Sequence, residues 1–381
     1  MKVDILIRGG RVMDPARGVD AQGDVAVVGN RIVPLPDGPV EAGQVVDASG
    51  CMVFPGLVDF HTHLFYSGGV TPIKPDILLA TGVTAAVDAG TSGAANYEAF
   101  HRADIVPSYL RIKSFVNVHS AGLPDEWMPE NIDPRYYNEK ELRRVVDRHG
   151  DDILGLKVRL AGELCDSIEP LKATIALAER VGGGLKVCVH VTNSPCTMEQ
   201  IAELLRPGDV FCHMYHGRRD TILDLRGKVW PGLLRARERG VVFDMSHGKG
   251  NFSHAVALQA VREGFWPDVI TTDTGDFKVY ISLWARSLPF IMSKMLAMGM
   301  DLRSILRAVT ETPAKLMGLA GTIGTLAPGA RADIALFTLE DRRVHYRDSL
   351  DTDYYGDKLL VPRFVICDGE YVWGAADFNI A

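Results

Sequence analysis

The sequence predicts an α/β protein, a (β/α)8 barrel of the TIM type with a small β-sandwich domain built from both chain ends. Apolar strand-like segments alternate with helix-like segments through the middle of the 381-residue chain. Residues 1–52, and the chain from Gly321 on, instead show strand patterns and hairpin turns. Neither end could bury a core alone, so we expect 1–54 and 321–381 to pair as one domain, with 55–320 as the barrel.

Short turns separate the strands expected at the two ends. Gly29-Asn30 and Asp368-Gly369 are two-residue hairpin signals. The expected strands are 3–7, 24–28 and 32–35 at the start and 332–337, 363–367 and 370–373 at the end. Residues 340–360 are polar and rich in Tyr and Asp, and we expect them to cross the surface.

Eight strand-like segments in the middle of the chain fit the barrel. They are 57–63, 85–89, 111–119, 154–160, 185–191, 210–214, 241–246 and 269–273. Helix-like segments between them are 139–148, 168–180, 198–206, 233–239 and 254–263, and further helices are expected up to about 319. A doubly wound sheet is the competing fold, but no Gly-rich dinucleotide loop follows an early strand.

Net charge, hydropathy and cysteine spacing limit the kinds of binding partner and the cellular compartment. A net charge of −7 and a pI near 5.9 argue against nucleic acid or an anionic membrane. No apolar run approaches the roughly 18 residues that span a bilayer. The six cysteines lack CxxC spacing, so we expect reduced and inert thiols at Cys165, Cys188 and Cys212. These features, and a start that lacks a signal-peptide layout, predict a cytoplasmic enzyme for a small-molecule substrate; a homo-oligomer is compatible with them.

Two histidines close the first barrel strand. His61 and His63 lie two residues apart, and alternate side chains of a strand share a face, so both can bind one cation. Imidazole suits zinc and its first-row neighbours. The alternative is a pair of histidines that are only hydrogen-bonded.

Further candidate ligands occur at the ends of other predicted strands, where barrels carry their function. Six of the eleven histidines lie at such ends, namely 61, 63, 119, 190, 213 and 247. The eighth strand ends in Asp273, and the fourth carries Lys157 among apolar residues. Histidines that only fill a core would scatter, so this convergence favours a metal site. Lys157 would either pair with a carboxylate or, if metals lower its pKa, take up carbon dioxide as a carbamate.

The motifs PGLVDFHTH, GLKVR, VCVH, FCH and TTD, one per strand in this order, resemble the amidohydrolase superfamily. ETPAKLMGL followed by GTLAPGARADIALF is similar to that superfamily's return to its β domain. The resemblance implies two divalent metal ions, zinc being favoured. His61, His63 and Asp273 would hold the first and His190 and His213 the second, with carboxylated Lys157 as the bridge. It also implies that a hydroxide between the metals attacks, while Asp273 acts as general base and then general acid.

Within the superfamily, GVTAAVDAGTSGA and VFDMSHGKGNFS resemble a dihydroorotase-like branch of deacetylases. That implies hydrolysis of an N-acyl amino acid or an O-acyl hydroxy acid. Leu64 follows the HTH motif where dihydroorotases usually have Arg. Ring opening of a cyclic amide, as by dihydroorotase or hydantoinase, is the alternative; a non-catalytic assembly protein and a mononuclear deaminase fit the ligand set less well.

Substrate contacts are predicted from position alone. Arg159 lies two residues beyond Lys157 on the same strand face, where it could bind a carboxylate or pair with a neighbouring strand. His247 and Gly248, at the end of the seventh strand, are expected to face the substrate. His119 is an open case, and His216 is a less direct ligand candidate than His213.

Overall fold

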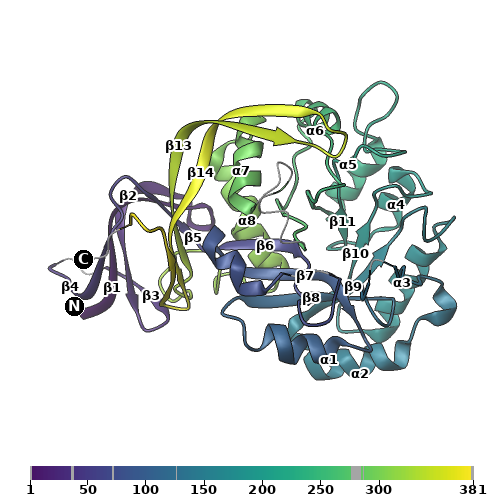
Figure 1. Cartoon of the computed structure of the whole chain (residues 1–381), viewed down its shortest axis with the longest axis horizontal. Helices are drawn as coiled ribbons and strands as arrows, with labels where there is room; N and C mark the ends of the chain where they lie inside the picture. Colours follow the sequence, from purple (N-terminus) through teal and green to yellow (C-terminus); the bar gives the residue numbers. More distant parts are fainter. Residues whose placement is uncertain are drawn as a thin grey trace.

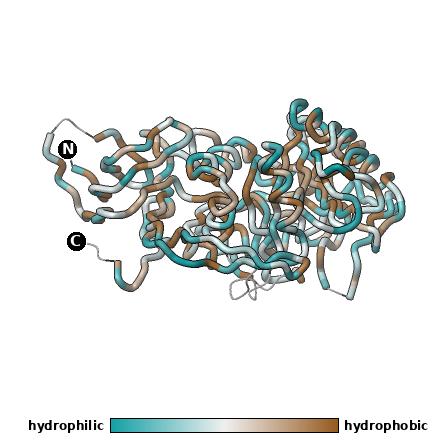
Figure 2. Tube along the Cα trace, turned by 90° about the horizontal axis from the view of Figure 1, so that it is seen from above, coloured by the Kyte–Doolittle hydropathy of each residue, from teal (hydrophilic) through white to brown (hydrophobic). Residues whose placement is uncertain are grey.

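The computed structural model describes residues 2–35, 38–70, 73–125, 127–275, 285 and 287–378. Its two parts lie side by side, with a β sheet at one end and a barrel at the other (Figure 1). Seen from above the molecule is elongated, and both chain termini lie at the sheet end (Figure 2). No helix within these ranges is long and apolar enough to cross a membrane.

The sheet is built from both ends of the chain, as predicted. Its order is β15-β14-β13-β5-β1-β2-β3, with β4 beside β1. The strands are β1 (Lys2–Asp14), β2 (Val19–Val28), β3 (Arg31–Val33), β4 (Glu41–Asp47), β5 (Met52–Pro55), β13 (Ile334–Arg347), β14 (Asp353–Cys367) and β15 (Glu370–Gly374). Antiparallel pairing of β5 with β13 joins the two ends, and apolar side chains of both form one cluster. The domain boundaries at 54/55 and 320/321 stay a prediction.

The barrel follows at once, since only Gly56 separates β5 from β6. A Cβ at Gly56 would lie 2.2 Å from Thr84 Oγ1, so the crossing from sheet to barrel needs glycine. Parallel strands then run in chain order as β6 (Leu57–Thr62), β7 (Val83–Gly93), β8 (Arg111–Asn117), β9 (Ile153–Arg159), β10 (Lys186–His190), β11 (Val210–Cys212) and β12 (Val242–Phe243).

Residues 269–274 complete the ring as an irregular eighth strand. Val269 bridges to Asp244 on one side, and Thr274 bridges to Thr62 on the other. The backbone N–H of Asp273 donates to the carbonyl of His61 at 2.8 Å. The predicted (β/α)8 fold with a β unit from both chain ends is therefore confirmed.

Helices surround the strands (Figure 1). They are α1 (Tyr97–Phe100), α2 (Glu139–His149), α3 (Glu169–Val181), α4 (Met198–Leu204), α5 (Pro231–Glu238), α6 (His254–Arg262), α7 (Leu288–Ala297), α8 (Leu302–Val309) and α9 (Glu311–Leu316). The outer helices alternate hydrophobic and hydrophilic residues, as helices with one buried face do (Figure 2). The five helices predicted up to residue 263 are all present, with small shifts at their ends.

The segment 340–360, which we expected to cross the surface, forms most of a β hairpin. Strands β13 and β14 extend beyond the sheet and arch over α7 towards α6 (Figure 1). At the tip, Ser349 N–H donates to the Phe252 carbonyl at 2.9 Å, and His254 N–H donates to Asp348 Oδ2 at 2.7 Å. Tyr354 O–H donates to the Ala297 carbonyl at 2.9 Å. The predicted strands 332–337 and 363–367 were too short because polar residues in the arm hid its strand pattern.

Candidate active site

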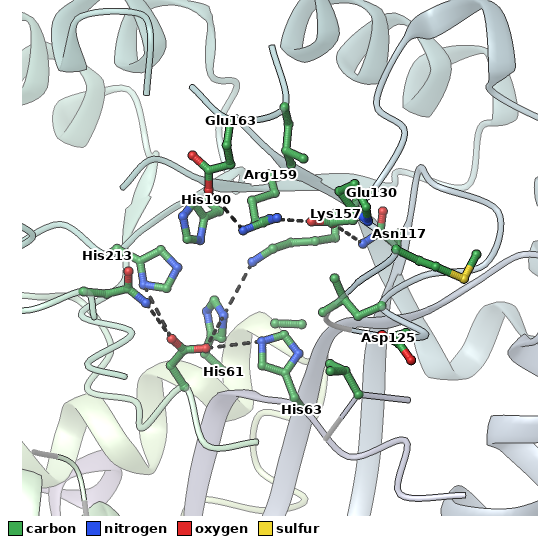
Figure 3. Close-up of a pocket in the computed structure, with 18 residues that line it drawn as sticks. His61, His63, Asn117, Asp125, Glu130, Lys157, Arg159, Glu163, His190 and His213 are labelled. Carbon is green, nitrogen blue, oxygen red and sulfur yellow. Dashed lines mark hydrogen bonds and ion pairs between the residues drawn. The ribbon is translucent and has the colours of Figure 1, made fainter. Parts of the chain in front are cut away.

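The strand ends of the barrel enclose one cavity of about 530 Å³. Seven of the nine predicted site residues line it, namely His61, His63, Lys157, Arg159, His190, His213 and Asp273 (Figure 3). His213 and Asp273 each follow a strand with positive φ, 59° and 53°. Non-glycine residues seldom adopt this conformation, and functional sites often retain it because it directs a side chain inward.

His61 and His63 meet at the lower edge of the cavity in Figure 3, and Asp273 lies against both of them. Asp273 Oδ1 lies 3.5 Å from His61 Nε2 and 3.2 Å from His63 Nε2. One donor atom of each residue lies within 4.8 Å of the others, which is the spacing that a single cation needs. Two imidazoles and a carboxylate are ligands that zinc accepts.

Neighbouring groups hold the histidine rings in place. Asp244 Oδ2 lies 2.7 Å from His61 Nδ1, Thr91 Oγ1 lies 2.9 Å from His63 Nδ1, and the Ser246 carbonyl lies 2.8 Å from His213 Nδ1. A proton on each Nδ1 leaves Nε2 as the nitrogen for a metal, as in most metal-binding histidines. Sequence reasoning missed Asp244, although it stands near the end of a predicted strand.

His190 and His213 form the opposite side of the cluster, with ring centroids 4.3 Å apart. Burial lowers the pKa of His213 to about 3, and burial followed by the proximity of His213 lowers the pKa of His190 well below its usual value. Both rings are therefore neutral at pH 7, the form that binds metals.

Lys157 lies between the two groups of ligands. Its Nζ is 3.5 Å from His61 Nε2, 3.6 Å from Cys188 Sγ and 3.9 Å from Cys212 Sγ. Burial alone would lower the pKa of this lysine. The nearby thiols and carboxylates outweigh burial and raise the pKa above its usual value, so without metals the amine carries a proton.

Asp273 is ionised in the same environment. Burial would raise its pKa, but the hydrogen bond to His63 and the charges of His213 and His61 lower it well below the usual range. Asn251 also donates from Nδ2 to Asp273 Oδ2 at 2.9 Å and lines the cavity. Sequence reasoning missed Asn251, which follows the seventh strand in an irregular segment.

Arg159 reaches the cavity from the end of β9. Its Nε donates to Glu130 Oε2, and Nη1 lies 3.4 Å from Oε1 of the more exposed Glu163. Glu130 is buried and accepts a hydrogen bond from Asn117 Nδ2 at 2.8 Å. Arg159 is thus held between a fixed carboxylate and the more exposed Glu163 at the wall of the cavity (Figure 3).

The structure places His247 and Gly248 differently from the expectation. Among the described residues, the lining of the cavity does not include either. His247 is fully buried, with Nδ1 2.8 Å from the Gly248 carbonyl and Nε2 2.7 Å from Lys294 Nζ. Gly248 packs against Asp273, where an added Cβ would lie 2.4 Å from Oδ2. Substrate contact by either residue stays a prediction.

The remaining strand-end histidines also lie off the cavity lining, as far as the described chain shows. His119 Nδ1 is 2.9 Å from the Gly122 carbonyl, within its own loop. His216 is buried with Nε2 3.3 Å from Met198 Sδ, and burial lowers its pKa to about 4. His213 rather than His216 therefore faces the cavity.

Comparison with known proteins agrees with this geometry. Residues 252–372 match the model of the amidohydrolase family. The chain is 31% identical over 360 residues to "Deacetylase Atu3266" of Agrobacterium fabrum, covering 93% of this chain and 86% of that protein. A crystal structure of an adenine deaminase superposes with a TM-score of 0.87 at 25% identity, over 98% of this chain and 100% of that one. A dihydroorotase structure gives a TM-score of 0.84 at 28% identity, over 98% of both chains.

Proposed function

Because the chain belongs to the amidohydrolase family and is a hydrolase, we propose that it cleaves an acyl amide or ester bond of a small carboxylic acid at a centre of two divalent metal ions. Substrates of this kind are N-acetyl amino acids and O-acetyl hydroxy acids. The observation that carries the proposal is the convergence of six ligand-type side chains on one cavity, in a chain that resembles a deacetylase over nearly its full length.

The residues present fit two metal ions. His61, His63 and Asp273 would hold the first, and His190 and His213 the second, with zinc as the favoured ion. The contacts at Nδ1 of His61, His63 and His213 support this assignment, because they leave one ring nitrogen of each for a metal. When bound, the metals supply a hydroxide at neutral pH and polarise the carbonyl of the substrate.

Lys157 is the proposed bridge between the two ions. Its amine is protonated where carboxylates and thiols dominate, but two divalent cations would invert that balance and favour the neutral amine. A neutral amine adds carbon dioxide and releases a proton, which gives an anionic carbamate. The new oxygens would extend from Nζ, which lies 3.5 Å from His61 Nε2, towards both groups of histidines.

Asp273 would move the proton of the reaction. Its carboxylate is ionised and lies at the cavity wall, so it can accept a proton from the attacking water. It then returns that proton to the departing nitrogen or oxygen. Asn251 holds one carboxylate oxygen and so restricts how Asp273 turns between these two tasks.

Arg159 would read the carboxylate of the substrate. Glu130 fixes the guanidinium from one side, and exchange of the looser partner Glu163 for a substrate carboxylate would keep the guanidinium paired on both sides. The second candidate is ring opening of a cyclic amide, which the similarity to a dihydroorotase structure favours.

The proposed location is the cytoplasm, since all six cysteines are free thiols.

The test combines metal quantitation with a substrate panel. We expect two ions per chain and faster hydrolysis of N-acetyl amino acids or O-acetyl hydroxy acids than of the same compounds with a neutral amide in place of the carboxylate. Arg159→Met should lower kcat/KM on the acids. The expected loss of transition-state stabilisation is about 1.5–3 kcal/mol, the contribution of a charge-assisted hydrogen bond. Arg144→Met, on the exposed face of α2, is the matched control. Equal rates on the neutral compounds, dihydroorotate or hydantoins would give ring opening precedence.

A further inference from the structure

A pair of thiols lies directly beneath the candidate metal centre and has no part in the proposed reaction. Cys188 and Cys212 belong to the neighbouring strands β10 and β11, and their Sγ atoms are 3.2 Å apart. The strand register pairs Cys188 with Val210 and His190 with Cys212, so the two thiols are offset by two residues on one face. Both are fully buried.

His61 supplies a third donor to this pair. One nitrogen of His61 and the two sulfurs all lie within 4.8 Å of one another. Because His61 Nδ1 is engaged by Asp244, Nε2 is the nitrogen available. Apolar residues of the barrel interior, including Val58, Val87 and Phe115, pack around the two cysteines.

We propose that Cys188, Cys212 and His61 form a binding site for a thiophilic cation such as Cd²⁺ or Zn²⁺, distinct from the centre that serves hydrolysis. Two thiolates and one imidazole suit soft or borderline ions and reject Mg²⁺ and Ca²⁺. A tetrahedral ion with metal–sulfur bonds of about 2.3 Å holds its two sulfurs roughly 3.8 Å apart. The observed 3.2 Å needs only a small rotation of the side chains to reach that spacing.

Charge balance favours this occupant. Two thiolates together carry the charge that neutralises a divalent ion, and any proton still on a sulfur leaves to solvent on binding. A neutral unit can be buried in the apolar barrel interior, whereas an unpaired charge there would be costly. A cysteine that only fills space in the barrel needs neither a second thiol nor a ring nitrogen beside it. The close approach of two sulfurs and one His61 nitrogen is therefore what indicates a site.

Lys157 is the competitor for the same sulfurs. Its Nζ lies 3.6 Å and 3.9 Å from them, and its ammonium would repel a cation bound between them. The thiol site also shares His61 with the centre assigned under the proposed function. The two cannot be filled together, and an ion held by the thiols would therefore inhibit the hydrolase.

The experiment uses the reduced full-length protein after removal of metals by a chelator. Titration with Cd²⁺ is followed by the sulfur-to-cadmium charge-transfer absorption and by cadmium NMR, whose chemical shift reports the number of sulfur ligands. We expect one thiol-bound ion per chain, with two sulfur ligands. Cys188→Ser or Cys212→Ser should abolish the band, whereas Cys165→Ser, which changes a half-buried thiol outside the pair, should keep it. Lys157→Met should tighten cadmium binding at least about tenfold by removing the ammonium.

Several outcomes would overturn the site. They are a wild-type protein whose cadmium has only nitrogen and oxygen ligands, a band that persists in the Cys188→Ser/Cys212→Ser double variant, and a band that Cys165→Ser also removes. The wild-type NMR measurement needs no variant to fold. None of these measurements uses a substrate, so they test the thiol site even if the proposed function fails.

Discussion

Two buried lysines of this protein each contact a histidine, and their surroundings differ in every other respect. Lys157 Nζ lies 3.5 Å from His61 Nε2 among thiols and carboxylates. Lys294 Nζ lies 2.7 Å from His247 Nε2 and faces the rings of Phe252 and Tyr346, whose centroids are 4.6 Å and 5.5 Å away.

The neighbours, not the pairing, decide the charge of each lysine. Anionic groups raise the pKa of Lys157 in spite of burial, whereas burial lowers the pKa of Lys294 to about 7 against the opposing charge of Asp348. Lys157 lines the cavity, and Lys294 lies on α7 close to Tyr346 of the hairpin that arches over the barrel. We propose that Lys157 is placed for chemistry and Lys294 for packing. A lysine next to a histidine therefore does not reveal its role; the surrounding charges and the degree of burial do.

The largest effect that the comparison predicts is at Lys157. Lys157→Ala removes the proposed bridge between the metals, so we expect at least one ion per chain to be lost and turnover to fall to background. A short carboxylic acid added to the buffer should restore part of the activity by taking the place of the carbamate. Metal analysis alongside the hydrolysis assay checks this. A variant with full metal content and full activity would mean that Lys157, like Lys294, serves packing alone.

Asp273 tests the carboxylate side of the same environment. Asp273→Asn keeps the shape and a carbonyl ligand but cannot carry a proton. We expect most of the metal to remain while kcat falls by roughly 10²–10⁴, the usual range for a positioned acid–base group. Asp166→Asn, on the loop after β9 and outside the cavity lining of the described residues, is the control. Turnover within a few-fold of the parent would reduce Asp273 to a structural role.

Because the pKa of Lys294 is lowered in the folded protein, the free energy of unfolding should depend on pH. The pKa in the folded protein is about 7 against a usual value of 10.5, so the unfolded chain binds more protons between these pH values. The cost of burying the lysine is therefore fully present below pH 7 and disappears as the pH rises towards 10.5. From pH 7 to pH 9 the free energy of unfolding should rise by about 2–3 kcal/mol more in the parent than in Lys294→Met.

Urea unfolding of both proteins at the two pH values measures that difference. Lys172→Met, an exposed substitution on α3, should give a curve parallel to the parent. Parallel curves for Lys294→Met as well would mean that Lys294 keeps its proton throughout, and the contrast with Lys157 would then disappear.

The sequence predicted the fold and the positions of the strand-end ligands because both follow from local periodicity. Neighbouring strands of a closed barrel end on one rim, so His61, Lys157 and Asp273 could be brought together without coordinates. Local periodicity does not reveal hydrogen-bond partners that come from distant segments. His61 and Asp244 are 183 positions apart, and Arg159 and Glu130 are 29 positions apart.

His247 shows why the position of a residue at a strand end does not by itself determine where its side chain lies. The chain turns sharply there, with positive φ at Ser246 and Gly248, 38° and 50°. The side chain consequently leaves the rim and meets Lys294 from a helix 47 positions further along the chain. Neither the turn nor that helix contact can be inferred from the position of a histidine at the end of a strand.

The smallest expected effect is at Asn251, where one hydrogen bond joins the irregular segment after the seventh strand to the carboxylate proposed to carry the proton. Asn251 Nδ2 donates to Asp273 Oδ2 at 2.9 Å, and Asp273 keeps its contacts with His61 and His63 when this bond is removed. We therefore expect Asn251→Ala to lower kcat roughly tenfold, the low end for a hydrogen bond to a charged group, with KM little changed. Asn138→Ala, which removes the cap of α2, should cost stability without this change in kcat. If KM rises while kcat holds, Asn251 contacts the substrate rather than positioning Asp273, and the proton carrier is fixed by its histidine neighbours alone.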